Sequence, residues 1–235
     1  KSTGSAAYGY AFAKGWRATA SLGSAFRAPT LYQRFSLYGD ASLQPETSRN
    51  VELGLKWAQD ASSFSATVYR NKVSNLINWV AGPGPCPGGS GPYPGCYNNV
   101  GQARYEGLTL AGSYRVGRVQ LHGSVDWQNP KDLDTGRRLA RRAKQHASLG
   151  ADTRWGDWKL GTQVQASGQR WDNAANTVAL GGYTLVHLYA STRLAQDWQL
   201  LARLDNLTDK NYTLANGYAS AGRSFYMGVK WAPAR

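Results

Sequence analysis

The dominant feature of the sequence is an alternation of apolar and polar residues with a period of two. In residues 119–127 (VQLHGSVDW) the odd positions are apolar and the even positions are polar, and 51–57, 158–166 and 225–231 repeat the pattern. Because successive side chains of a β-strand point to opposite faces, this predicts strands with one apolar and one polar face. We expect eleven strands, at residues 6–13, 16–26, 51–57, 63–72, 103–115, 119–127, 141–153, 158–166, 183–194, 198–206 and 225–231.

The lengths of these strands and of their connections favour a membrane protein. A tilted strand that crosses a bilayer needs about 9–11 residues, whereas strands of globular proteins average about 5–6. Bacterial outer-membrane barrels join their strands by short periplasmic turns and long extracellular loops in alternation. Short turns are predicted at 14–15, 58–62, 116–118, 155–157 and 195–197, and long Gly/Pro/Asn-rich loops at 27–47, 80–100, 129–139, 171–182 and 208–222. The chain is therefore predicted to be all-β, a transmembrane antiparallel up-and-down β-barrel of about 11 strands.

Tryptophans mark one end of the predicted strands. They occupy the apolar phase at the short-turn end at Trp16, Trp57, Trp158, Trp198 and Trp231. Tryptophan is enriched at membrane–water interfaces, so this set predicts a periplasmic aromatic girdle. A soluble β-sandwich gives no reason for tryptophan at the same end of five strands.

The alternation also predicts which residues line the lumen. We expect one face to carry Gln120, His122, Ser124, Asp126, Lys159, Gln163 and Gln165, and the opposite face to carry Val119, Leu121, Val125, Leu160 and Val164. The reason is the two-residue period of side-chain direction in a strand.

The formal net charge of +13 invites comparison with nucleic-acid-binding proteins. Footprints of that kind cluster on one face, whereas the basic residues here are scattered along the chain. A basic lumen or an anionic lipopolysaccharide surface explains the charge equally well, so no nucleic-acid partner is expected. Enzymatic activity is not expected either, because the sequence holds no catalytic constellation; His122, His146 and His187 lack metal-ligand spacing.

The two cysteines, Cys86 and Cys96, lie in a Gly/Pro-rich stretch that is predicted to be an external loop. An exposed loop in an oxidising compartment favours a disulfide over two free thiols. No histidine lies nearby, which argues against a metal site.

The direction of the strands across the membrane predicts on which side each end of the chain lies. The last strand ends near the periplasm at Trp231, and eleven strands then place Lys1 on the extracellular side. Single-chain bacterial barrels begin and end in the periplasm and have an even number of strands. The sequence also lacks a signal peptide, so we expect a fragment of a longer protein.

Several stretches resemble TonB-dependent outer-membrane receptors, and most closely their cobalamin-transporting branch. They cover most of the chain: residues 24–31 (SAFRAPTL), 43–46 (LQPE), 97–107 (YNNVGQARYEG), 141–145 (RRAKQ) and 205–212 (DNLTDKNY). Barrels of this family have 22 strands, so the resemblance implies that residues 1–235 are the C-terminal half of such a barrel, with the plug domain and the N-terminal barrel half absent. It also implies a bacterial outer-membrane location and partnership with the TonB complex through the missing N-terminal region. No cofactor or metal ligand is expected in this half, because the resemblance places the calcium-binding loops in the other half.

The resemblance also supplies the candidate substrate-binding residues, Arg141 and Asn173. In the cobalamin branch the first arginine of the RRAKQ motif reaches the ligand from the upper barrel, although Arg141 is equally compatible with pairing to a plug or barrel carboxylate. Asn173 follows the GxRxD-like segment 168–172 (GQRWD), but an aromatic residue expected near Ala175 is missing. Glu46, Asp205 and Arg223 are expected to make structural contacts in the lumen.

The predicted function is therefore TonB-dependent active uptake of a scarce, large solute, with cobalamin the first candidate. A ferric-siderophore or other metal-chelate receptor is the alternative within the class. A passive porin or an adhesin barrel would share the strands but lack the RAPT, LQPE and NLTDKNY segments.

Overall fold

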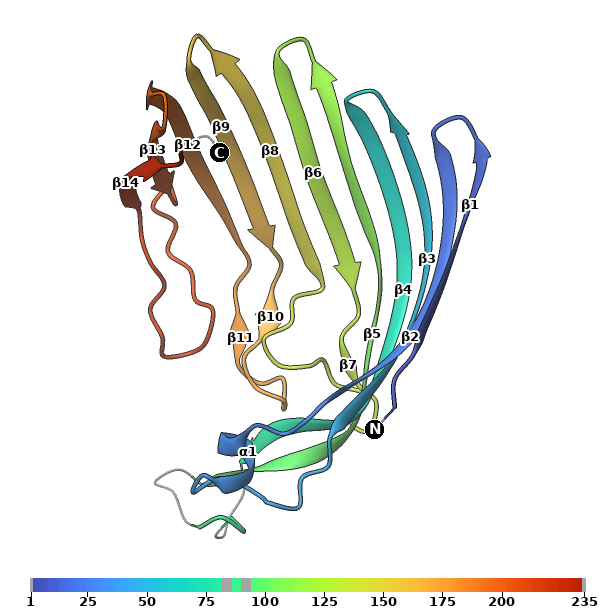
Figure 1. The fold of residues 1–235 in the computed structure, drawn as a ribbon. Coiled ribbons are helices and arrows are strands. Elements are labelled where there is room, and N and C mark those ends of the chain that lie inside the picture. The colour runs from blue at the N-terminus through green and yellow to red at the C-terminus, as the bar shows by residue number, and fades with distance from the viewer. Residues whose placement is uncertain (1, 82–85, 90–93, 234–235) are drawn as a thin grey trace.

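The computed structural model describes residues 2–81, 86–89 and 94–233. Its main element is one antiparallel sheet of eleven long strands (Figure 1). They are β1 (Ser5–Ala13), β2 (Trp16–Arg27), β3 (Glu46–Gln59), β4 (Ser62–Ala81), β5 (Gly95–Val116), β6 (Val119–Gln128), β8 (Gln145–Trp155), β9 (Trp158–Ser167), β12 (Tyr183–Ala195), β13 (Trp198–Asp205) and β14 (Ser224–Trp231). Shorter elements in the loops are α1 (Leu31–Phe35), β7 (Lys131–Asp132), β10 (Arg170–Trp171) and β11 (Ala179–Leu180).

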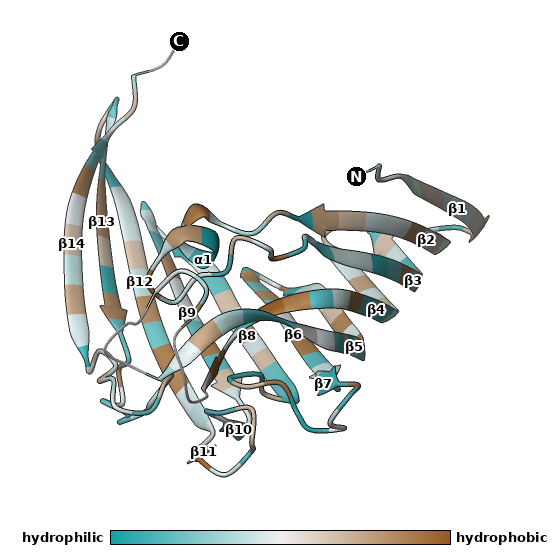
Figure 2. Cartoon of the chain, turned by 90° about the horizontal axis from the view of Figure 1, so that it is seen from below, coloured by the Kyte–Doolittle hydropathy of each residue, from teal (hydrophilic) through white to brown (hydrophobic). Residues whose placement is uncertain are grey.

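The long strands pair in their order along the chain, which confirms the predicted up-and-down arrangement. The sheet is strongly curved, and β1 and β14 form its two edges (Figures 1 and 2). β7 adds to β5, and β10 and β11 form a separate two-stranded ladder. Within the described ranges, no helix has the length and apolar character needed to cross a membrane.

All five short connections are two-residue turns at the same end of the sheet, at residues 14–15, 60–61, 117–118, 156–157 and 196–197. The five tryptophans of the predicted girdle, Trp16, Trp57, Trp158, Trp198 and Trp231, all lie at this end of their strands, as predicted. Trp16 packs against Trp57, and Trp198 against Trp231, each pair with ring centroids 6.4 Å apart. The turn end is thus held mainly by contacts between neighbouring strands, and the Gln120 Nε2 of β6 also donates to the Ala61 carbonyl at 3.2 Å, across β5.

The pairing register separates the side chains into two faces, because directly opposed residues of antiparallel strands point to the same side. The polar face carries every residue predicted for it: Gln120, His122, Ser124, Asp126, Lys159, Gln163 and Gln165. The apolar face carries Val119, Leu121, Val125, Leu160 and Val164. Hydropathy therefore alternates along the strands (Figure 2), and the prediction is confirmed.

Most large apolar side chains of the apolar face stay exposed. Leu53, Val68 and Leu149 are about half-exposed, which suits a surface that meets lipid rather than a second protein layer. The described apolar residues that are buried lie mainly toward the long-loop end, as Leu43, Val73, Ile77, Ala103, Leu139, Ala143, Leu180 and Leu185.

Three sequence predictions need correction at the long-loop end. The segment 80–100, expected to be all loop, is partly strand, because β4 and β5 continue to pair as far as Ala81 and Gly95. Similarly, β3 starts at Glu46 rather than at residue 51. The strand expected at 141–153 starts only at Gln145, because Arg141 has a φ of +58° and its N–H bonds to the Trp171 carbonyl.

The predicted disulfide is present. The sulfur atoms of Cys86 and Cys96 lie 2.08 Å apart. The bond closes the tip of the long β4–β5 hairpin, whose residues 82–85 and 90–93 lie outside the described residues.

Candidate functional site: the external loops

The first long loop is fixed to the sheet through Glu46, the last residue of the LQPE segment. Glu46 is buried, with 8% of its surface exposed. One carboxylate oxygen accepts hydrogen bonds from the Arg27 guanidinium and from the Ile77 N–H, the latter at 2.8 Å. The other oxygen accepts from Arg27 Nε at 2.8 Å. One carboxylate therefore joins the ends of β2 and β3 to the upper part of β4, which is the structural role expected of this residue.

The rest of the first loop lies against the β4–β5 hairpin (Figure 1). The Tyr97 N–H donates to the Tyr38 carbonyl at 2.8 Å, and the Gly88 N–H donates to Gly39 at 2.9 Å. Tyr32 of α1 meets the edge of the Tyr97 ring at 6.0 Å between centroids. The disulfide-closed hairpin and the loop that precedes β3 thus form one external unit.

A second loop, residues 129–144, folds over the polar face. Its Leu139 packs in a buried cluster with Val73 and Ala103. These two residues oppose each other in β4 and β5, next to Lys72 and Arg104 of the apolar face, so they point to the polar side. The loop is therefore anchored on the lumen side of the wall.

Arg141 lies where three external loops meet. Its Nε donates to Asp172 Oδ1 at 2.8 Å, and the same oxygen accepts from the Asn216 N–H at 3.1 Å. Its side chain remains 54% exposed. Within the described residues, the terminal Nη1 and Nη2 groups have no hydrogen-bond partner. Asp172 therefore orients the guanidinium and leaves its outer donors available.

The Arg141–Asp172 pair also sets the ionisation of the carboxylate. The hydrogen bond from Arg141 lowers the pKa of Asp172 below its usual value, and the Asn216 N–H adds to the effect, whereas burial acts in the opposite direction. Asp172 is consequently charged at neutral pH and holds the three loops together.

Asn173, the second candidate from the sequence, lies next to Asp172 and supports its own loop. Its Oδ1 accepts from the Thr177 and Val178 N–H groups, and its Nδ2 donates to Thr177 Oγ1 at 2.8 Å. One N–H of the amide has no partner within the described part of the chain. The structure thus brings Asn173 and Arg141 to adjoining segments.

Two further residues of this region were not selected from the sequence. Arg170 is 4% exposed, stacks over the Tyr183 ring and donates to the Thr213 carbonyl at 2.6 Å. Asn176 has a φ of +57° and exchanges hydrogen bonds with the backbone of Arg138. Arg170 lies inside the GQRWD segment, so it could have been selected from that motif. Asn176 could not, because its role depends on a contact between distant loops.

Below the loops, the polar face carries hydrogen-bonded pairs that brace the wall. Asp152 accepts from the Tyr189 hydroxyl and contacts His122 Nδ1 at 3.2 Å. Asp205 contacts His187 Nδ1 at 2.9 Å and accepts from Arg203 Nε at 2.8 Å. This is the structural contact predicted for Asp205. For Arg223, which was also expected to make a structural contact, the structure shows a contact of the backbone, whose N–H donates to Asp209 Oδ1 at 2.8 Å. Among the described residues, no group of three or more metal-ligating side chains occurs.

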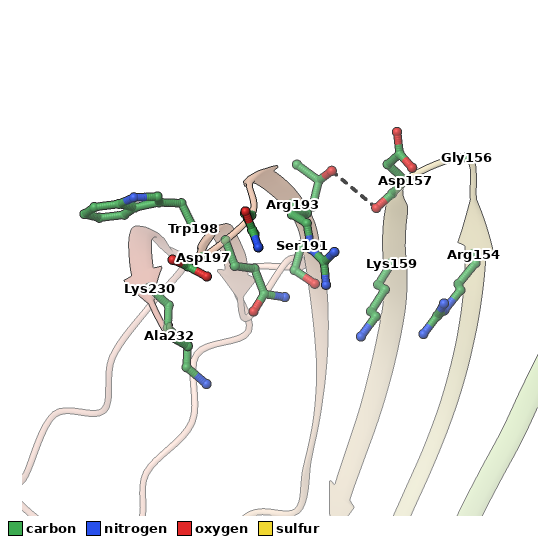
Figure 3. A pocket seen from close by; sticks show the side chains of 13 residues that line it. Arg154, Gly156, Asp157, Lys159, Ser191, Arg193, Asp197, Trp198, Lys230 and Ala232 are labelled. Atoms are coloured by element: carbon green, nitrogen blue, oxygen red, sulfur yellow. Dashed lines mark hydrogen bonds between the residues drawn. The ribbon is translucent and has the colours of Figure 1, made fainter. Parts of the chain in front are cut away.

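At the turn end, the polar face forms a basic cavity of about 470 Å³. Arg154 and Lys159 oppose each other in β8 and β9, and Lys230 and Arg193 come from β14 and β12 (Figure 3). Asp157 and Asp197 of the adjoining turns also line it. The cavity lies at the opposite end of the sheet from Arg141, so it is not part of the same site.

An up-and-down antiparallel sheet with an exposed apolar face, a polar face and long loops at one end is the wall of a transmembrane β-barrel. A family model described as "TonB dependent receptor-like, beta-barrel" matches residues 1–207. The chain belongs to this family of outer-membrane receptors and transporters.

Named relatives and solved structures agree with this placement. The vitamin B12 transporter BtuB of Vibrio cholerae serotype O1 is 32% identical over 97% of this chain and 37% of the relative. BtuB of Photobacterium profundum is 30% identical over 89% of this chain and 34% of the relative. The chain thus spans well under half the length of these relatives. The structure of the copper transporter OprC is similar over 98% of this chain and 39% of that chain, with a TM-score of 0.79 and 23% identity. The ferric enterobactin receptor PfeA of Pseudomonas aeruginosa matches 98% of this chain and 40% of that chain, with a TM-score of 0.76 and 22% identity.

Proposed function

We propose that residues 1–235 form the C-terminal half of the barrel of a TonB-dependent transporter that takes up cobalamin. In this proposal the plug domain and the other barrel half belong to the same, longer protein, and the TonB complex supplies the energy for uptake. The chain contributes the barrel wall and five external loops that shape the ligand vestibule. It performs no covalent chemistry in this role.

The observation that carries the proposal is the position of Arg141. Leu139, two residues earlier, anchors the loop on the polar face, and Asp172 holds the guanidinium through Nε. The two terminal nitrogens can then donate to a ligand. Arginine presents its donors as a planar fork that suits amide and phosphate acceptors, and cobalamin carries both kinds of group. Arg141 can therefore pair with Asp172 and contact a ligand at the same time.

Asn173 is assigned to the same vestibule. Its side-chain oxygen fixes the turn over residues 173–178, and the free N–H of its amide is a second donor for the ligand. The identity to BtuB over nearly the whole chain supports cobalamin as the solute.

A metal chelate is the second candidate. The ferric enterobactin receptor and the copper transporter share the fold of this chain, and a basic vestibule also suits the anionic groups of a ferric siderophore. These structures share only the fold of this chain, so we rank a metal chelate behind cobalamin, which the sequence identity to BtuB supports.

Equilibrium binding of cobalamin to the full-length protein tests the proposal. Arg141→Ala is expected to weaken binding by about 1–3 kcal/mol, the scale of a lost charged hydrogen bond. Arg142→Ala is the matched control, because this neighbouring arginine is exposed and makes no contact with Asp172; it should leave affinity unchanged. Unchanged affinity in Arg141→Ala would remove Arg141 from the site. Wild-type protein that binds a ferric siderophore but no cobalamin would favour the second candidate.

A further inference from the structure

The apolar face carries one group of charged side chains at its long-loop end. Pairing places Arg49 opposite Lys72, and Lys72 opposite Arg104, across β3, β4 and β5. In the next row on the same face, Arg70 lies opposite Glu106. Directly opposed residues share a face and lie about 4.5–5.5 Å apart at Cβ. These five residues therefore form one patch, which we call the cationic patch.

The cationic patch stands alone on this face. Asn75 of β4 has a φ of +58°. On the turn side of Asn75, the five residues of the patch are the only charged side chains that the structure describes at outward-pointing paired positions of the eleven long strands. On β9 and β12 the corresponding end of the face carries Ala166 opposite Thr184. The patch is thus a local feature of three strands rather than a general rim.

Its height on the wall matches the external edge of the membrane. Arg49 stands eight residues above the girdle residue Trp57 on the same strand, which is about 26 Å at about 3.3 Å per residue. With the usual strand tilt of about 35–45°, this becomes about 20 Å of height, near the edge of an apolar band about 25 Å tall. Long basic side chains at such a boundary extend their charges toward the polar layer.

The charges within the patch do not cancel. Glu106 binds two of the cations, with Arg70 Nε at 3.1 Å and Arg104 Nη2 at 3.2 Å. Arg49 and Lys72 have no acidic partner within the described residues. The buried Nε of Arg104 also has no acceptor there. The patch keeps a formal charge of +3, with Glu106 holding two guanidinium groups in place.

We propose that the cationic patch binds the phosphate groups of a lipid A-type glycolipid in the outer leaflet. The ligand must lie in the membrane, because the patch points away from the lumen and directly borders exposed apolar residues such as Leu53 and Val68. It must be anionic, because four cations face one carboxylate. Guanidinium groups bind phosphate through paired hydrogen bonds, and the apolar residues below would contact the acyl chains.

Native mass spectrometry of the full-length protein in detergent, titrated with bisphosphorylated lipid A, tests this site. The double variant Arg49→Gln/Lys72→Gln should bind lipid A at least about fivefold more weakly. The control Arg154→Gln/Lys159→Gln removes two opposed cations from the polar face of the same wall and should stay within about twofold of wild type. Heat-modifiable electrophoretic mobility confirms that each variant is a folded barrel.

Two further arms identify the ligand. Dephosphorylated lipid A should bind wild type as weakly as lipid A binds the double variant, and inorganic phosphate at equal concentration should not compete. The variant Arg49→Lys/Lys72→Arg keeps the charge and should retain lipid A binding. Equal losses in the double variant and its control, undiminished binding of the dephosphorylated lipid, or full competition by inorganic phosphate would each overturn the proposal.

Discussion

The two ends of the sheet are held together by different kinds of interaction. At the turn end, two-residue turns and paired tryptophans join strands that follow each other in the chain. At the loop end, single side chains connect distant segments: Glu46 reaches Ile77, Asn99 reaches Gln44, and Asp172 reaches Asn216. Long-range side-chain contacts therefore contribute to the order of the loop end, alongside the β4–β5 pairing and the disulfide, whereas the turn end depends mainly on backbone pairing between neighbouring strands.

Because of this difference, the strands provide most of the stability, whereas the loops at the other end are the part expected to contact a ligand. We therefore expect the loops to lose order when one of these polar contacts is removed, while the strands below remain paired. Local opening of this kind costs less free energy than global unfolding. A ligand that contacts Arg141 would thus bind to the loops, whose local opening costs less free energy than unfolding of the paired strands.

The largest expected effect is at the turn end. Gly15 has a φ of +77°, and a Cβ there would lie 2.6 Å from the Ala58 carbonyl oxygen. Gly15→Ala should reduce the free energy of unfolding by about 2–3 kcal/mol, because conformational strain and a backbone clash add together. Gly136 of the loop end has a similar φ of +70° and open space around it. Gly136→Ala should cost only about 1 kcal/mol.

Urea unfolding of the full-length protein in lipid vesicles measures both changes. Equal costs for the two variants would show that the turn end is no more tightly packed than the loops, and would remove the contrast between the two ends.

An intermediate effect is expected from Glu46→Ala. The change leaves Arg27 and the Ile77 N–H without their shared acceptor, which costs about 2 kcal/mol. Hydrogen exchange should become about 10- to 100-fold faster in the first loop and in upper β4, and remain unchanged beside the two-residue turns. Glu52→Ala is the control, because among the described residues Glu52 accepts a side-chain hydrogen bond only from the nearby Asn50. Faster exchange at both ends of the sheet in Glu46→Ala would contradict a local role.

The smallest expected effect is a dependence on pH at Asp172. Because its pKa is lowered in the folded protein, the stabilisation is complete above the unfolded value of about 3.9 and is lost as the pH falls through the lowered folded value. Exchange of the Arg141 amide should therefore be protected from pH 7 to about pH 5, after correction for intrinsic rates, and lose protection only below about pH 4. Asp172→Asn should remove this transition. A transition near neutral pH in wild type would point to a different group.

The contrast between the ends also explains what could be predicted from the sequence. Residues 119–127 and 158–166 reveal their strands through local alternation, and Lys14-Gly15 reveals its turn, because these features depend on neighbouring residues. The start of β8 at Gln145 could not be predicted, because the conformation of Arg141 is set by contacts with Trp171 and Asp172, about thirty positions away. The extension of β4 and β5 was missed for a related reason, since pairing compensates for a composition typical of loops.

The candidate site shows the same division. The RRAKQ and GQRWD segments directed attention to Arg141 and to the loop of Asn173. GQRWD ends on Asp172, but neither segment indicates that Asp172 is the carboxylate that pairs with Arg141. The Asp172–Asn216 contact depends on a backbone N–H, which no side-chain pattern indicates. The contribution of both residues to ligand binding stays a prediction.

The most direct test of the account is the environment of the two faces of β6 in the intact membrane protein. Nitroxide labels would be placed on single cysteines at His122, Ser124, Leu121 and Val125, since the native cysteines are joined in a disulfide. The spin relaxation of labels at Leu121 and Val125 should be accelerated mainly by oxygen, which concentrates in lipid. The relaxation of labels at His122 and Ser124 should be accelerated by a water-soluble nickel chelate, or by neither reagent where a plug excludes both. Relaxation accelerated mainly by oxygen at all four positions, or the reverse pattern, would contradict a wall with one face in lipid and the other in the lumen.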